Sequence, residues 1–166
     1  MPDRRGRDLT VGIESIDEQH RELRRRAAAF LRAHAGRTRQ DVGALLSYLR
    51  IYAVAHFGEE EEAMRRTAFP GYERHKAQHE RFLRDLLALS TQQERRHGPG
   101  VPPRDVARWL KAWLTEHVSR TDMEMARYFA HVRADESQRG ETDAREPFEL
   151  RPFGLAEAAP EGIGRK

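Results

Sequence analysis

The residues of this chain that could do chemistry are histidines and carboxylates at helical spacing. His56 and Glu60 stand four residues apart, and His75 and His79 repeat that spacing. On an α-helix, side chains four residues apart project from one face, so both can reach one object. Imidazole nitrogens and carboxylate oxygens are ligands of iron, manganese and zinc. The two pairs therefore indicate a metal site.

Three further residues extend this pattern: His20 near the start of the chain, and His117 with Asp122 five residues later. Each signal alone is common in proteins without a metal, since a lone histidine on an apolar face is usually a core residue. The combination is different, because burying five imidazoles and two carboxylates without partners would be costly. The seven candidate metal ligands are His20, His56, Glu60, His75, His79, His117 and Asp122.

The composition of this set limits the kind of centre. Seven ligands are too many for one tetrahedral zinc ion and suit two ions with the carboxylates bridging them. The chain has no cysteine, which removes thiolate sites and iron–sulfur clusters. Ferritin-like di-metal bundles use two Glu-x-x-His pairs. The only such pair here, Glu94 with His97, stands beside a loop, so a ferritin-like centre is not expected.

Four helical segments must position these ligands, because each ligand lies in a stretch whose apolar residues recur at helical spacing. Thr38 followed by Asp41 resembles a capping box, and Pro70 and Gly71 break the chain after the second segment. The helices are expected at about 17–34, 38–66, 72–95 and 104–132. Long helices joined by short loops predict an all-α, up-down-up-down four-helix bundle with the metal centre in its interior.

The candidate ligands continue the apolar faces of these helices. On the third helix, His75 and His79 are followed at helical spacing by Phe82, Leu83 and Leu86. A stripe of this kind faces the core of a bundle. The histidines are therefore expected to point inward.

The spacing of His117 and Asp122 predicts a local distortion of the fourth helix. At about 100° per residue, an i,i+5 pair points roughly 140° apart on a regular α-helix, against about 40° for an i,i+4 pair. A π-type bulge or a long reach by the carboxylate is needed to bring both to one metal pair.

The remaining composition is that of a helix-rich protein with wide solvated faces, because 34% of its residues are charged. Two domains are expected: the bundle at 1–134, and an acidic, Pro- and Gly-containing tail at 135–166 that is disordered or loosely docked. The basic run 24–26 is interpreted as a solvated helix face, so no nucleic acid partner is expected. No apolar run is long enough for a membrane span and none follows the basic start, so a cytoplasmic address is expected by default.

Four motifs carry a resemblance to a known family. They are Val11-Gly12-Ile13-Glu14-Ser15-Ile16-Asp17-Glu18-Gln19-His20, His56-Phe57-x-x-Glu60, Phe69-Pro70-Gly71-Tyr72-x-x-His75-x-x-x-His79 and Trp113-Leu114-x-x-His117-x-x-x-x-Asp122. In order and spacing they resemble the bacterial hemerythrin family over about residues 10–132, with all seven ligand positions filled. The tail lies outside the resemblance.

The resemblance implies a non-heme di-iron centre. One iron would be bound by His75, His79 and His117, and the other by His20 and His56, with one position left open for dioxygen. The two carboxylates and a solvent-derived oxo or hydroxo group would bridge the irons. The implied function is reversible dioxygen binding for storage, delivery or scavenging. The alternative is a di-iron enzyme or sensor acting on peroxide, nitric oxide or O2; an enzyme would need a proton donor beside the open position, and the sequence identifies none.

Three apolar residues are expected to form an oxygen pocket beside the centre. Leu23 is three residues after His20, and Trp113 and Leu114 are four and three residues before His117. These spacings direct their side chains at the site, where they would exclude water. Ordinary core packing is an alternative that does not exclude this role. The residues expected in the core are Met64 and Met125, and those expected on the surface or in loops are His34, His97 and His131.

Overall fold

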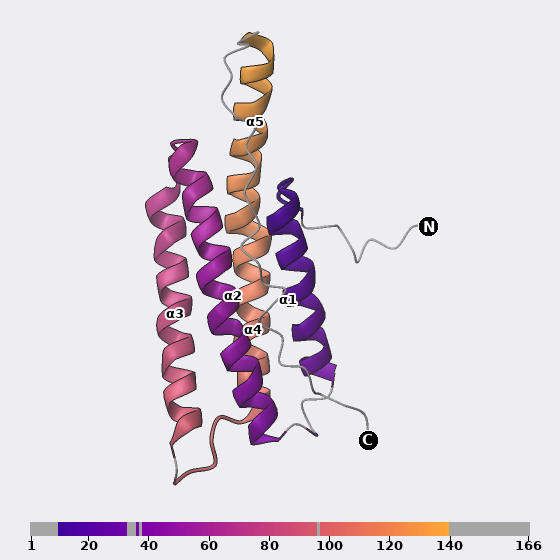
Figure 1. Cartoon of the computed structure of the whole chain (residues 1–166), viewed down its shortest axis with the longest axis vertical. Helices are drawn as coiled ribbons and strands as arrows, with labels where there is room; N and C mark the ends of the chain where they lie inside the picture. Colours follow the sequence, from indigo (N-terminus) through magenta and orange to yellow (C-terminus); the bar gives the residue numbers. More distant parts are fainter. Residues whose placement is uncertain (1–9, 33–35, 37, 96, 140–166) are drawn as a thin grey trace, which may run out of the picture.

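The structure, a computed structural model, describes residues 10–32, 36, 38–95 and 97–139. Its helices are α1 (Glu14–Arg32), α2 (Arg39–Arg66), α3 (Tyr72–Glu94), α4 (Pro103–Glu116), the π-helical segment η2 (His117–Asp122) and α5 (Met123–Arg139). The last three follow one another without a break and form one long rod. Figure 1 shows four rods side by side, with neighbours in the chain running in opposite directions. The predicted all-α, up-down-up-down bundle is confirmed.

The helix ends follow local side-chain chemistry. The predicted capping box is confirmed: Asp41 N donates to Thr38 Oγ1 at 3.2 Å, and Thr38 N donates to the Asp41 carboxylate at 2.8 Å. The fourth rod is longer than predicted, because α5 continues to Arg139 and takes in the first five residues assigned to the tail. The rest of the expected tail, 140–166, lies outside the described residues.

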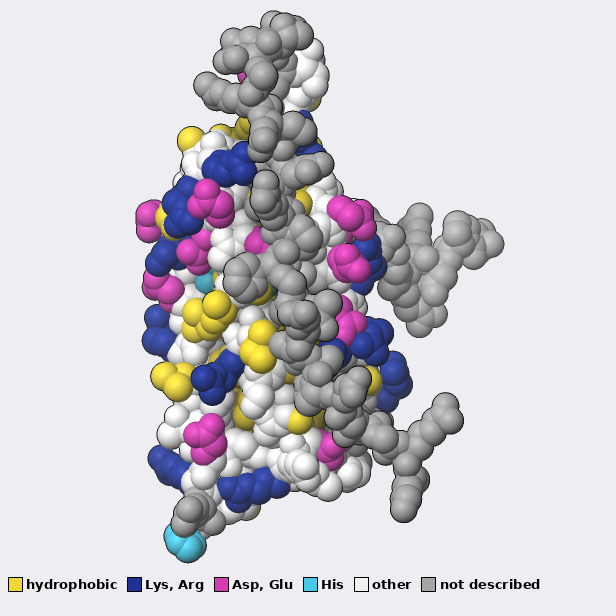
Figure 2. Space-filling model, in the orientation of Figure 1, with side chains coloured by type: hydrophobic (Ala, Val, Ile, Leu, Met, Phe, Trp, Pro, Cys, Tyr) yellow, Lys and Arg dark blue, Asp and Glu magenta, His cyan; other side chains and the backbone are white. Residues whose placement is uncertain are grey.

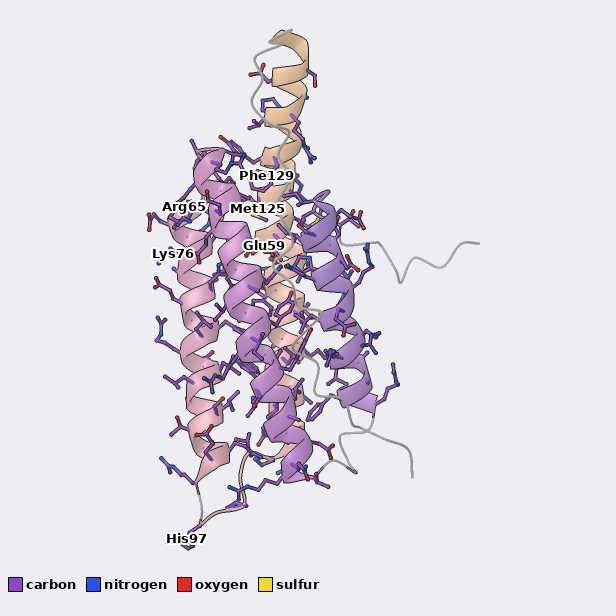
Figure 3. The ribbon with its side chains drawn as sticks, in the orientation of Figure 1. Glu59, Arg65, Lys76, His97, Met125 and Phe129 are labelled. Atoms are coloured by element: carbon purple, nitrogen blue, oxygen red, sulfur yellow. The ribbon has the colours of Figure 1, made fainter. Side chains whose placement is uncertain are left out.

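Two apolar clusters fill the bundle at different heights. The lower core lies toward the α3–α4 loop and includes Leu23, Leu49, Tyr52, Phe82 and Leu110, with Trp113 and Leu114 packed against it. The upper core lies toward the other end and consists of Val11, Ile13, Ile16, Ala63, Met64, Phe69, Met125, Ala126 and Phe129. The core assignment of Met64 and Met125 is thus confirmed. In Figure 3, Met125 and Phe129 lie above the labelled Glu59, and His97 lies at the opposite end of the bundle.

The surface differs from the sequence prediction at one position on α3. Leu83 is 38% exposed, whereas Phe82 and Leu86 are 1% exposed. The inward face of α3 is narrower than the predicted stripe, because Phe82 and Leu86 are four residues apart and Leu83 is rotated by about 100° from Phe82. On the face shown in Figure 2, basic and acidic side chains are interspersed with apolar ones. None of the described helices is long and apolar enough to cross a bilayer.

Candidate metal centre

The seven candidate ligands lie together in one buried layer between the lower and the upper core. Each of these residues is at most 1% exposed. Every rod of the bundle contributes: His20 comes from α1, His56 and Glu60 from α2, His75 and His79 from α3, and His117 and Asp122 from the two ends of η2. Glu59, labelled in Figure 3, marks the height of this layer. The structure therefore assembles the whole predicted set in one place.

The donor atoms fall into two overlapping groups. The three-histidine group is Glu60, His75, His79 and His117, and the two-histidine group is His20, His56, Glu60 and Asp122. Within each group the donor atoms all lie within 4.8 Å of one another, and Glu60 belongs to both. The other carboxylate also lies between the groups: Asp122 Oδ1 is 3.0 Å from His117 Nε2, and Oδ2 is 3.3 Å from His20 Nε2. Both carboxylates therefore lie between the two histidine groups.

The π-helical segment explains how His117 and Asp122 share this layer. The distortion predicted from their spacing is confirmed, since η2 begins at one of them and ends at the other. A π-turn closes i→i+5 hydrogen bonds and so accommodates one more residue per turn than a regular helix needs. Residues five apart then project from nearly the same face. Asp122 is fully buried, so its carboxylate is directed into the layer.

Three of the five imidazoles are oriented by hydrogen bonds at their outer nitrogens, whereas those of His20 and His75 have no partner within the described residues. His56 Nδ1 donates to Gln19 Oε1 at 2.7 Å, and Gln19 Nε2 donates in turn to Glu59 Oε1 at 2.9 Å. An acceptor at Nδ1 fixes the ring tautomer and leaves the Nε2 lone pair facing the layer. The same arrangement occurs at His79, whose Nδ1 lies 3.1 Å from Glu61 Oε1.

His117 has a comparable partner in Gln78. Its Nδ1 lies 3.2 Å from Gln78 Oε1, which also accepts a hydrogen bond from Thr121 Oγ1 at 3.0 Å. Sequence reasoning missed these outer partners. A signal was present, since Gln19 and Gln78 each stand directly before a candidate histidine, but each of them serves a histidine of another helix.

The electrostatics of the layer favour the protonation states that bind metals. Burial lowers the pKa of His56 to about 3 and that of His117 to about 4, so both rings are neutral at pH 7. Burial alone would raise the pKa of Glu60 and Asp122, but the surrounding imidazoles outweigh it and hold both values below the usual range. Metal ligation requires neutral imidazole and ionised carboxylate.

His75 is the exception among the imidazoles. Burial opposes its protonation, but the carboxylates of Asp122 and Glu60, at 3.3 and 3.4 Å from its Nε2, raise its pKa to about 9. Without a metal this ring carries a proton between two carboxylates. A cation bound there would take the place of that proton.

The layer fits a bound cation, because its carboxylate oxygens face imidazole nitrogens without forming hydrogen bonds to them. All four oxygens of Glu60 and Asp122 are buried and have no hydrogen bond of acceptable geometry within the described part of the chain. Four such atoms in one layer would be costly to desolvate unless a metal takes them up. The donor set contains only nitrogen and oxygen, which suits borderline and hard ions.

The three residues predicted to form an oxygen pocket adjoin this layer from below. Leu23 is fully buried, whereas Trp113 and Leu114 are partly exposed. The Trp113 ring stacks on His117 with ring centroids 4.5 Å apart. Their contact with oxygen stays a prediction. His97 and His131 are exposed, as predicted, and His34 lies outside the described residues.

A further residue beside the layer, Tyr52, was not singled out by the sequence analysis. It is 1% exposed, and its ring stacks on that of His56 with centroids 4.9 Å apart. Burial, followed by the nearby charges of Glu60 and Asp122, raises its pKa well above 10, so the hydroxyl stays protonated. The four-residue spacing from His56 was the available signal.

A helical bundle with a buried layer of histidines and carboxylates defines the chain as a candidate metal-binding protein, and comparisons with known proteins identify its family. The sequence profile of the hemerythrin HHE cation binding domain matches residues 11–129. A bacteriohemerythrin from Stenotrophomonas maltophilia is 31% identical over 120 residues, covering 72% of this chain and 76% of the relative. A hemerythrin from Siphonosoma cumanense is 32% identical over 111 residues, covering 66% and 78%. The chain belongs to the hemerythrin family, as its motifs predicted.

Proposed function

We propose that this protein binds dioxygen reversibly at a non-heme di-iron centre, for oxygen storage, delivery or scavenging. Relatives named hemerythrin and bacteriohemerythrin support the proposal. The observation that carries it is the unequal division of five histidines around two shared carboxylates. A cytoplasmic location is part of the proposal and is consistent with the absence of cysteine.

The division of ligands predicts one complete and one incomplete iron. Three imidazoles (His75, His79 and His117), two carboxylates and a bridging solvent oxygen would fill six positions, the usual octahedral number. The other iron would have the same three oxygens but only His20 and His56, which leaves a position for dioxygen. When bound, the two irons would supply the electrons that dioxygen takes up on binding and returns on release.

The chain itself holds ligand rings in the form that binds metal, and it keeps water away from the centre. Three rings donate hydrogen bonds from their outer nitrogens to oxygens of Gln19, Glu61 and Gln78, and these bonds hold the rings in the ligating tautomer. Leu23 below the layer and Met125 above it are fully buried, so apolar side chains close the layer on both sides. Exclusion of water prevents loss of the bound ligand through side reactions.

The test combines metal analysis with an anaerobic oxygen titration. Protein produced with ample iron should contain two irons per chain, and the reduced protein should develop a visible absorption band on addition of O2. Purging should remove the band and restore the colourless reduced form through repeated cycles. A single metal per chain, or tightly bound zinc, would contradict the di-iron centre. Catalytic loss of added peroxide or nitric oxide, without reversible oxygen binding, would favour the enzyme.

A further inference from the structure

A buried hydroxyl group lies beside the candidate metal centre and takes no part in holding it. Tyr52 is 1% exposed, and its hydroxyl oxygen has no hydrogen-bond partner within the described part of the chain. Its ring stacks on His56, a member of the two-histidine group. A buried phenol usually finds a partner, because leaving its O–H unpaired is costly. The missing partner therefore calls for an explanation.

The direction of the helices places Tyr52 on the same side of the layer as the predicted oxygen pocket. Tyr52 stands four residues before His56 on α2, and Leu114 three residues before His117 on the fourth rod. Leu23 stands three residues after His20 on α1, which runs the opposite way (Figure 1). All three side chains therefore lie one turn below the ligands, where Leu23 and Tyr52 belong to the lower core and Leu114 packs against it.

A second buried donor without a hydrogen-bond partner among the described residues, Trp113 Nε1, belongs to a ring that stacks on His117 of the three-histidine group, whereas the Tyr52 ring stacks on His56 of the two-histidine group. Gln19 is already hydrogen-bonded to His56 and Glu59. Gln78 is likewise hydrogen-bonded to His117 and Thr121. The upper core, on the far side of the layer, is made of apolar side chains. The Tyr52 ring thus lies against the two-histidine group on the side of the predicted pocket, and its hydroxyl has no hydrogen-bond partner among the described residues.

We propose that Tyr52 is a ligand-binding residue whose O–H donates a hydrogen bond to the small molecule held on the two-histidine side, either dioxygen or a small anion. This inference rests on the proposed function, because it requires a ligand position beside His20 and His56. The role is that of a hydrogen-bond donor that keeps its proton, which differs from the proton donor that an enzyme would need. A donor of this kind favours ligands that carry negative charge once bound, since hydrogen bonds to charged acceptors are the stronger ones.

The test uses azide as the probe ligand and the iron-loaded, oxidised full-length chain. Tyr52→Phe removes only the hydroxyl, and Tyr48→Phe is the matched control, one turn away on α2 with its ring under Arg26. Azide affinity should fall roughly tenfold or more in Tyr52→Phe, the effect of one hydrogen bond to a charged group, and stay unchanged in Tyr48→Phe. The vibrational frequency of bound azide should shift in D2O in the parent protein and lose that shift in Tyr52→Phe. Equal azide affinities in all three proteins would overturn the inference.

A second measurement avoids dependence on one variant. Incorporation of 3-fluorotyrosine, a stronger acid, strengthens the donor and should tighten azide binding severalfold in the otherwise unchanged chain. Unchanged azide affinity after incorporation would overturn the role of Tyr52 even where Tyr52→Phe fails to hold iron. The outcomes also separate the two proposals. Azide binding that does not depend on Tyr52 refutes only this inference, whereas a protein that takes up no iron refutes the proposed function itself.

Discussion

The two halves of the ligand layer are built differently. In the three-histidine half, the rings of His79 and His117 have outer acceptors in Glu61 and Gln78, and the Phe57 ring stacks on His79 at 3.9 Å between centroids. In the two-histidine half, Gln19 holds the outer nitrogen of His56. Each half also has one ring whose outer nitrogen has no hydrogen-bond partner within the described residues, His20 in this half and His75 in the other.

This difference indicates that the two halves have different roles. The half with three imidazoles and aromatic packing is suited to holding a metal firmly. The half with two imidazoles adjoins the Tyr52 hydroxyl and the apolar side chain of Leu23, and is suited to receiving a ligand. Because Glu60 belongs to both groups, neither half is expected to keep its metal independently of the other.

The largest expected effect is loss of metal from the three-histidine half. His79→Ala should lose most of both irons, because it removes one imidazole directly and frees Glu60, whose oxygen lies 3.1 Å from His79 Nε2. Metal analysis of purified protein measures this. His97→Ala, at an exposed position in the loop, is the control and should retain two irons. Retention of both irons by His79→Ala would show that the halves are independent.

The role of the π-helical segment can be tested by comparing a deletion inside it with a deletion in the regular helix that follows. Deleting the exposed Ser119 removes the extra residue of η2, so a regular helix can form with α5 still in register. His117 and Asp122 then become an i,i+4 pair on a regular helix, so Asp122 should stay directed into the layer, and both the iron content and the melting temperature should change little. Deleting the exposed Glu124 from the regular helix should instead rotate Met125 and Phe129 by about 100° out of the upper core and lower the melting temperature strongly. Equal stability losses in the two deletions would contradict this account.

The contrast between η2 and the outer partners shows what the sequence could predict. The distortion at His117 and Asp122 follows from the spacing of two residues on one helix, so it was accessible. The roles of Gln19 and Gln78 depend on how neighbouring helices are rotated about their axes, because each serves a ring on another helix. The exposure of Leu83 was missed for the same reason, since it lies at the boundary of a face whose width is set by the neighbouring helix.

Removal of an outer partner should have an intermediate effect and should compare the halves directly. Gln78→Leu takes the acceptor from His117, and Gln19→Leu takes the acceptor from His56. Loss of such partners lowers metal affinity by about 10- to 100-fold in known sites. Gln19→Leu should also alter azide binding, because His56 lies in the ligand-receiving half, whereas Gln78→Leu should affect iron retention alone. Competition with a chelator and azide titration measure the two effects, and identical profiles would remove the distinction between the halves.

Leu114 should change the lifetime of the oxygen complex without changing iron content. It lies one turn below His117, packs against the lower core and is partly exposed. Leu114→Ala would admit water, and Leu114→Tyr would add a proton-donating hydroxyl; both should hasten decay to the oxidised form severalfold. The decay of the visible band after mixing with O2 measures this. Unchanged decay in both variants would refute the pocket role of Leu114 and leave the metal site intact.

The smallest effect is expected from removing residues 140–166, which follow all seven candidate ligands in the sequence. All seven candidate ligands precede Asp135, and α5 reaches Arg139 before this segment begins. Its sequence lacks the apolar periodicity of a further core helix, so neither half should depend on it. The truncated chain should keep two irons, its helicity by circular dichroism and the azide affinity of the two-histidine half. A fall in melting temperature beyond about 8 °C, roughly 2–4 kcal/mol for a chain of this size, would instead mean that the segment packs on the bundle. If azide affinity changed as well, the segment would have to cover the ligand-receiving half. Contact with the three-histidine half alone would be detected only as a loss of iron.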